Sequence, residues 1–349
     1  MLKRRFSAAL LVFLLGAVLL NSSAMSEPTD ANVLPNGSFE SIRGLHIVTY
    51  LLSPEDAKMI VDRAANAGMN TLIIGVAWNG STQLKSMPWV PQGKAWTSDQ
   101  LLDFAEYARS KGMQVIPHVP LLTNADKLLL GAHDELLYNL STYDPSNEKV
   151  YELVLPILEE IVALLKPKAI HVGHDEVWGW KNVDFEKDRL REGESILPAD
   201  LYLGHILRIH EYLDQRNVEM WMWGDMLISY EEFPNMTGDG ALHRGIEKFG
   251  YGASLRKKIP RGIVICDWHY RDKQFEFPSL ATFRREGFKV VGTTWQQEDT
   301  VRNFTRYAAE NGGTGMIAST WYFVQRRDWE VVNRVIDYSG KIYSDYFGG

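Results

Sequence analysis

"MNTLIIGVAW" (residues 69–78), "TSDQLLDFAEYARSKG" (residues 97–112) and "MQVIPHVP" (residues 113–120) are the segments that decide the fold. The first and third are almost continuously apolar, which is typical of parallel strands covered on both faces. The second has the period of a helix, with Thr97 and Ser98 as candidate N-caps and Gly112 as a candidate C-cap. Together they predict a strand, a helix and a second, parallel strand.

The same alternation continues through the chain on both sides of this unit. Eight strand candidates lie within residues 44–52, 69–78, 113–120, 169–176, 218–227, 262–270, 289–296 and 315–323. Eight β/α units fit a (β/α)₈ barrel, which typically has about 250 residues. An open doubly wound sheet is the alternative, but no Gly-rich phosphate loop follows the first strand. We predict an α/β protein with one catalytic domain, a (β/α)₈ TIM barrel over residues 43–349.

The N-terminus has the organisation of a secretory signal peptide. Lys3, Arg4 and Arg5 precede an apolar run over residues 8–20, and small residues follow at 22–24. The run is shorter than the ~20 residues that cross a membrane. We expect a signal peptide over residues 1–24 and an exposed lead-in over residues 25–42. The mature protein would be secreted or periplasmic, without stable membrane insertion, and an uncleaved anchor is the alternative.

Composition excludes some classes of protein. The net charge of -7 argues against binding to nucleic acid, which requires a basic surface. The only cysteine, Cys266, lies in the apolar stretch "IVICDW", so it cannot form an internal disulfide and is expected to be a buried, inert thiol.

Polar and aromatic residues gather where the predicted strands end. In TIM barrels these C-terminal strand ends form the functional face. The candidates chosen from them are His118, Asp175, Glu176, Trp223, Asp225, Asp267, Tyr270, Trp295 and Trp321. Asp225 is equally well explained as a helix cap, and His118 as a structural residue. The chain has 11 Trp, and indole faces beside carboxylates favour a carbohydrate pocket.

Asp175 and Glu176 are adjacent carboxylates at the end of the fourth strand. Because side chains alternate along a strand, His171 and Asp175 share the inward face and Ile170 the outward one. Glu176 follows where the strand becomes a loop, so both acids flank one site. Neighbouring carboxylates raise one pKa, as a general acid requires. The alternative is an acidic helix N-terminus. His171 is expected to pack or to orient its neighbours.

The segment "HVGHDEV" (residues 171–177) resembles the H-x-G-G-D-E-V motif of the family 20 glycoside hydrolases, the β-N-acetylhexosaminidases. His171, Gly173, Asp175, Glu176 and Val177 match the motif, and His174 replaces its second glycine. "RGLHIV", "WMWGDML" and "VICDWHY" look like the first, fifth and sixth strands of compact members. The resemblance extends from about Arg43 to the C-terminus.

This resemblance implies an exported, exo-acting β-N-acetylhexosaminidase that acts on glycans containing N-acetylhexosamine, without a metal or other cofactor. The mechanism would be substrate-assisted and retaining. Asp175 would orient the substrate's acetamido group, and Glu176 would protonate the leaving oxygen. Trp223, Trp295 and Trp321 would form apolar walls, and Asp267 and Tyr270 would contact the sugar.

The chain also departs from the family pattern. The family's first-strand Arg is missing near Val48 and Thr49, His118 stands where the family has Glu, and no Glu follows Trp321 at the family's spacing. Recognition of sugar hydroxyls is therefore rebuilt. A catalytically altered sugar-binding barrel remains an alternative. So does a metal-dependent barrel hydrolase using His171, His174, Asp175 and His269, although His171 and His174 would face opposite ways.

Overall fold

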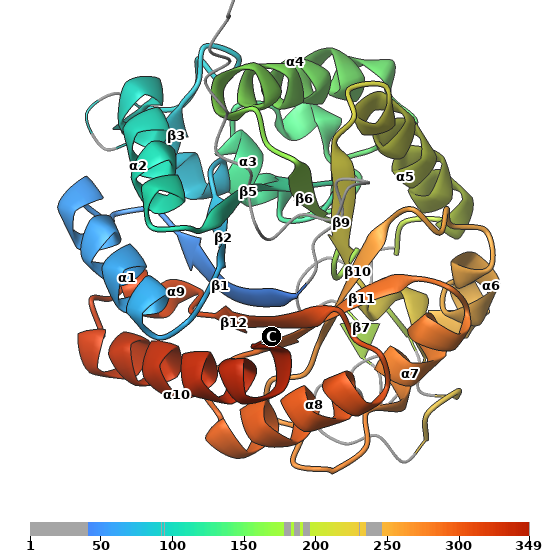
Figure 1. Ribbon diagram of the computed structural model, residues 1–349. Helices are drawn as coiled ribbons and strands as arrows, with labels where there is room; N and C mark the ends of the chain where they lie inside the picture. Colours follow the sequence, from blue (N-terminus) through green and yellow to red (C-terminus); the bar gives the residue numbers. More distant parts are fainter. Residues whose placement is uncertain are drawn as a thin grey trace, which may run out of the picture.

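The computed structural model describes residues 41–348, apart from residues 92, 94, 178–182, 185–188, 191–195, 230 and 235–245. In this part of the chain eight parallel strands close into a barrel in the order β1-β12-β11-β10-β9-β6-β5-β2 (Figure 1). They are β1 (Ile42–Val48), β2 (Thr71–Gly75), β5 (Gln114–Leu121), β6 (Ala169–Gly173), β9 (Glu219–Trp223), β10 (Val264–Trp268), β11 (Lys289–Thr294) and β12 (Gly315–Ser319). The predicted TIM barrel is confirmed.

Helices surround the barrel (Figure 1). The longer ones are α1 (Pro54–Asn66), α2 (Ser98–Ser110), α4 (Glu148–Leu165), α5 (Ala199–Asp214), α7 (Pro278–Arg285), α8 (Glu298–Glu310) and α10 (Trp329–Phe347). The cap of α2 is as predicted, because Thr97 and Gln100 form a reciprocal capping box. Gly112 follows that helix with φ +78, a left-handed conformation that glycine adopts without strain.

Short elements lie in the connections between the barrel strands and the longer helices. They are the 3₁₀ turns η1 (Trp78–Gly80), η2 (Asp134–Leu136), η3 (Asp225–Leu227) and η5 (Ile246–Phe249), the helices α3 (Ala125–Leu129), α6 (Ala253–Arg256) and α9 (Tyr322–Gln325), and the strand pairs β3 (Thr82–Gln83) with β4 (Trp96–Thr97) and β7 (Val183–Asp184) with β8 (Arg189–Leu190). The turn η3 directly follows β9, and this position matters for the site described below.

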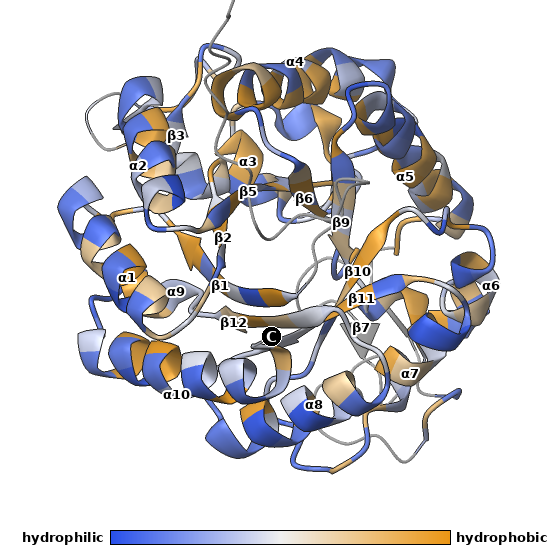
Figure 2. Cartoon of the chain, in the orientation of Figure 1, coloured by the Kyte–Doolittle hydropathy of each residue, from blue (hydrophilic) through white to orange (hydrophobic). Residues whose placement is uncertain are grey.

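The core has two layers. One apolar cluster fills the space between strands and helices, and a smaller one fills the barrel interior. In Figure 2 the barrel strands are mainly hydrophobic, whereas the helices have hydrophilic outer surfaces. Along β6, Ile170 and Val172 belong to the outer layer and Ala169 to the inner one, so the predicted alternation holds. Cys266 is buried in the inner cluster, as expected.

The two ends of the described chain meet at the barrel. The side chain of Arg43 donates to the carbonyl of Phe347 at 2.8 Å, which joins β1 to the end of α10. β1 begins at Ile42, one residue before the expected start of the barrel, and Ile42 is buried. The predicted signal peptide and almost all of the predicted lead-in lie outside the described residues. Among the helices that are described, none combines the length and apolar character needed to cross a membrane.

Candidate active site

A cavity of about 640 Å³ opens at the C-terminal ends of the barrel strands. Its described lining comes from residues that end or follow seven of the eight strands, namely Val48, Trp78, Asn79, Thr123, Asn124, Asp126, Lys127, Leu140, Ser141, Asp175, Glu176, Trp223, Trp268, Tyr270, Trp321, Tyr322 and Gln325. Ligand sites typically have volumes of about 300 to 1,000 Å³ and lie at this end of TIM barrels. The cavity is therefore the candidate active site.

Asp175 and Glu176 both line this cavity and are half-buried. The backbone makes them converge, because Gly173, His174 and Glu176 have φ of 75°, 71° and 41°. Such left-handed residues turn the chain sharply as it leaves β6. Adjacent side chains, which would diverge on a regular strand, thus reach the same opening. The placement of the two acids agrees with the sequence prediction.

Residues after β5 hold the carboxylate of Asp175. Its Oδ1 accepts hydrogen bonds from Thr123 Oγ1 at 3.0 Å and from Asn124 Nδ2 at 3.4 Å. Burial raises the pKa of Asp175, and the two donors act in the opposite direction. The donors therefore favour the ionised form and fix the orientation of the carboxylate.

Asp225 lies behind the two acids and is only 2% exposed. Its Oδ2 accepts the backbone N–H of Glu176 at 3.0 Å. Burial, followed by the charge of Asp175, raises the pKa of Asp225 to about 7. Asp225 does not line the cavity, so it makes no sugar contact there, and its side chain caps no helix. Both sequence interpretations of Asp225 therefore disagree with its position.

Aromatic side chains form the walls of the cavity. Trp223, Tyr270 and Trp321 line it as predicted, and Trp321 Nε1 donates to the hydroxyl of Tyr270 at 3.0 Å. Trp78 and Trp268 also line it, although they were not among the residues predicted from the sequence. Trp78 is the last residue of the second predicted strand segment and Trp268 lies near the end of the sixth, so the strand-end criterion itself could have identified them. Indole faces of this kind suit the apolar faces of sugar rings.

The profile of the glycosyl hydrolase family 20 catalytic domain matches residues 71–294, well over half of the chain. The chain belongs to glycosyl hydrolase family 20. The match includes the whole of the motif at residues 171–177, whose Asp175 and Glu176 line the cavity. No curated protein matches the sequence of this family 20 chain.

Solved structures share the fold. Dispersin B has 15% sequence identity and a TM-score of 0.59, and the match covers 88% of this chain and 100% of that chain. The β-N-acetylhexosaminidase of Bacteroides fragilis NCTC 9343 has 16% identity and a TM-score of 0.59, covering 87% and 66%. The exo-β-N-acetylglucosaminidase of Vibrio harveyi, solved with N-acetylglucosamine, has 18% identity and a TM-score of 0.58, covering 87% and 54%. This chain thus spans all of Dispersin B but only part of the larger proteins.

The remaining predicted residues of the family 20 site lie away from the cavity. Asp267 points outward from β10, where the Ser279 hydroxyl of α7 donates to it at 2.8 Å. Its neighbours Cys266 and Trp268 face inward, so alternation excludes Asp267 from the interior. Trp295 is also in the outer layer, stacked on Phe323 with ring centroids 5.3 Å apart. Asp267 and Trp295 therefore do not line the cavity in which the sequence analysis expected them to contact the sugar.

His118 and His171 are buried in the barrel interior and do not line the cavity. Their ring centroids are 4.7 Å apart, and His118 Nδ1 lies 3.0 Å from His46 Nε2. His171 packs against Trp223, with 4.2 Å between ring centroids, and its Nδ1 accepts the N–H of Gly173. The expected substrate contact of His118 is not made here. His171 supports a cavity wall and the turn after β6, which suits an orienting residue.

His174 stands in place of the second glycine of the family motif. A left-handed backbone costs a non-glycine residue about 1–2 kcal/mol. Its ring stacks on His205 of α5 at 5.0 Å, and the Tyr202 hydroxyl donates to its carbonyl at 2.7 Å. These contacts offset the backbone strain, so the substitution keeps the turn that presents Asp175 and Glu176.

The residues considered for a metal site are not brought together. His171 faces the barrel interior, His174 faces α5 and His269 faces α7, where it contacts Ser279. Across the described ranges no group of three or more His, Cys, Asp or Glu is arranged to hold a metal ion. His171 and His174 therefore face opposite ways, as predicted.

Proposed function

We propose that the chain is an exported, exo-acting β-N-acetylhexosaminidase that releases terminal N-acetylhexosamine by a substrate-assisted, retaining mechanism. The observation that carries this proposal is the convergence of Asp175 and Glu176 on one aromatic-walled cavity in a family 20 domain. Family 20 enzymes are exceptions to the two-carboxylate scheme, because the substrate's own acetamido group is the nucleophile.

In the first step the acetamido oxygen attacks C1, and the bond from C1 to the leaving oxygen breaks. Glu176 gives its proton to that oxygen. Asp175 binds the acetamido N–H and stabilises the positive charge of the oxazolinium intermediate. Thr123 and Asn124, which hold Oδ1 of Asp175, keep the carboxylate directed at the substrate.

In the second step water attacks C1 and loses a proton to Glu176, which restores the acid and reopens the acetamido group. The sugar leaves with its original anomeric configuration. The indoles of Trp223, Trp268 and Trp321 would enclose the acetamido methyl group and the ring. A preorganised site of this kind stabilises the charge that develops in the transition state.

Two of the related structures support the substrate class. The Bacteroides fragilis protein is described as a β-N-acetylhexosaminidase, and the Vibrio harveyi protein as an exo-β-N-acetylglucosaminidase in complex with N-acetylglucosamine. The proposed export rests on the charged and apolar pattern of residues 1–24. N-terminal sequencing of the mature protein from its native host tests export, and a retained residue 1 would contradict cleavage.

A panel of aryl β-glycosides tests the activity. We expect hydrolysis of the N-acetylglucosaminide or N-acetylgalactosaminide and none of the glucoside or galactoside, which lack the internal nucleophile. Glu176→Gln should lower kcat by about 10²-fold or more while binding persists. Asp175→Asn should lower both kcat and affinity for the acetamido group.

Matched controls are Asp103→Asn and Glu106→Gln, the same chemical changes on exposed residues of α2. They should retain full activity. Full turnover by Glu176→Gln, or equal turnover of glycosides with and without the acetamido group, would refute the mechanism. Calorimetric binding of N-acetylhexosamine without any turnover would instead favour the sugar-binding barrel.

A further inference from the structure

Asp225 is a buried carboxylate that contacts the Asp175–Glu176 turn without lining the cavity. Its Oδ2 accepts the N–H of Glu176 at 3.0 Å, and it also accepts a hydrogen bond from the side chain of Trp268. Its Oδ1 is buried without a hydrogen-bond partner among the described residues. A buried carboxylate with an unsatisfied oxygen is costly, so its retention needs a reason.

Asp225 holds Glu176, whose backbone is strained. Glu176 has φ +41, a left-handed conformation that non-glycine residues keep only when their surroundings enforce it. Without Asp225 the backbone N–H of Glu176 would lose this hydrogen-bond acceptor. The hydrogen bond to Asp225 therefore fixes where the side chain of Glu176 begins.

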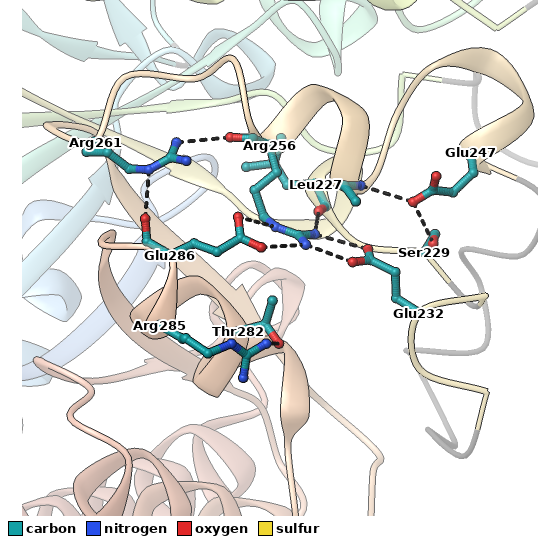
Figure 3. A network of polar contacts seen from close by, with 10 residues as sticks. Leu227, Ser229, Glu232, Glu247, Arg256, Arg261, Thr282, Arg285 and Glu286 are labelled. Carbon is teal, nitrogen blue, oxygen red and sulfur yellow. Dashed lines mark hydrogen bonds and ion pairs between the residues drawn. The ribbon is translucent and has the colours of Figure 1, made fainter.

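Asp225 is itself held in place. It opens the turn η3, and the carbonyl of Leu227 in that turn accepts Arg256 Nη1 at 2.6 Å. Arg256 also forms paired hydrogen bonds with Glu232 and Glu286 (Figure 3). The side chain of Arg256 is only 3% exposed. The turn thus cannot move away from Glu176 without breaking a buried ion network.

Charge couples Asp225 to the same acids. The titratable groups that act on it or are affected by it are Asp175 after β6 and Tyr202 on α5, and the backbone N–H of Glu176 donates to it. Trp268 on β10 adds a neutral donor. Burial and then the charge of Asp175 raise the pKa of Asp225, and conversely a negative Asp225 raises the pKa of neighbouring acids.

We propose that Asp225 is a positioning residue, which fixes Glu176 through its backbone and adjusts the charge state of the Asp175–Glu176 pair. This assignment rests on the proposed function, because it gives Glu176 the role of acid. It replaces the sugar contact expected from the sequence. It also explains why residue 225 is a carboxylate. A neutral amide could accept the same N–H, so a purely structural hydrogen bond would not require a buried acid.

Two variants separate the effect of the hydrogen bond to the Glu176 N–H from the effect of the negative charge of Asp225. Asp225→Asn keeps an oxygen for the N–H of Glu176 and removes the charge, whereas Asp225→Ala removes both. On an aryl N-acetylhexosaminide we expect kcat to fall about 10-fold in the first and at least about 100-fold in the second, with KM changed less than about threefold. Without the negative charge, neighbouring acids lose protons more readily, so the basic limb of the kcat/KM profile of Asp225→Asn should move to lower pH.

Glu231→Gln is the matched control. It removes one negative charge from an exposed residue of the same segment after β9, and it should leave the pH profile in place. If Asp225→Asn behaves like Glu231→Gln, or if Asp225→Ala retains wild-type kcat, the proposal is overturned.

A second measurement does not depend on activity. A carboxyl group with a raised pKa stabilises the folded protein below its unfolded pKa and loses that contribution as pH rises through the folded value. The Tm of the wild type should therefore fall more steeply between pH 4 and 7 than that of Asp225→Asn. If every N-acetylhexosaminide is inert, the proposed function fails, and identical slopes of Tm against pH would then reject the charge coupling independently.

Discussion

At the scale of single residues, the turn after β6 has a strained backbone that contacts with neighbouring residues stabilise. Asp175, Glu176 and His174 each have a specific partner from another part of the barrel, namely Thr123 after β5, Asp225 after β9 and His205 on α5. Functional sites commonly hold such strained backbone because neighbouring structure enforces it. The chemistry proposed for Asp175 therefore depends on groups that have no contact with the reacting bond.

Thr123→Val tests that dependence. The change keeps the shape of the side chain but removes the 3.0 Å hydrogen bond to Asp175 Oδ1. A hydrogen bond to a charged group contributes about 1.5–3 kcal/mol, so kcat/KM should fall about 10-fold or more. Loss of a donor raises the pKa of Asp175, which must be ionised, so the acidic limb of the pH profile should shift upward. An unmoved acidic limb would show that Thr123 does not set the charge of Asp175.

The sequence could predict these residues only in part. Alternation along β6 placed His171 and Asp175 inward because the strand is regular up to Gly173. Asp267 and Trp295 were selected only because they lie near strand ends, and alternation, which places Asp267 outward between Cys266 and Trp268, was not applied to them. Thr123 and Asn124 were missed because Leu122 and Asn124 both have positive φ and turn the chain back toward β6. No local pattern in the sequence indicates such a turn.

At the scale of elements, the strands and helices follow from local patterns, whereas their polar connections do not. Capping residues and apolar periodicity mark α1 and α2 in the sequence itself. Arg256 instead pairs with Glu232 and Glu286, 24 and 30 residues away, and only closure of the barrel brings them together. This network joins α6 to α7 and to the segment after β9 (Figure 3).

Arg256→Met should destabilise the protein by about 2–4 kcal/mol, since it leaves two partly buried carboxylates without their cation. Chemical denaturation measures this change. Arg302→Met is the control, because Arg302 pairs with Glu298 on an exposed face of α8 and such pairs contribute about 0.5 kcal/mol or less. Equal losses in the two variants would mean that the Arg256 network adds no more than a surface ion pair.

At the scale of the whole molecule, stability should depend on pH through a second buried cluster on the opposite face of β10. His269 Nδ1 lies 2.6 Å from Asp272 Oδ2, and its Nε2 lies 3.0 Å from the Ser279 hydroxyl. These residues and Asp267 are buried and connect β10 to α7. The Ser279 hydroxyl donates to Asp267, so the group joins two elements rather than presenting a nucleophile.

Burial by itself would lower the pKa of His269, but Asp267 and Asp272 outweigh it and raise the pKa to about 10. A group whose pKa is raised on folding contributes fully below its unfolded value of about 6.5 and loses that contribution as pH rises through the folded value. The upper bound is about 5 kcal/mol, from 1.36 kcal/mol per pKa unit. This window lies above that of Asp225, so the two effects can be separated.

The Tm of the wild type should therefore fall between pH 6.5 and 10, and the Tm of His269→Gln should start lower and change less. His210→Gln, which replaces a histidine of α5, should keep the slope of the wild type. A slope retained in His269→Gln would mean that this imidazole is neutral in the folded protein.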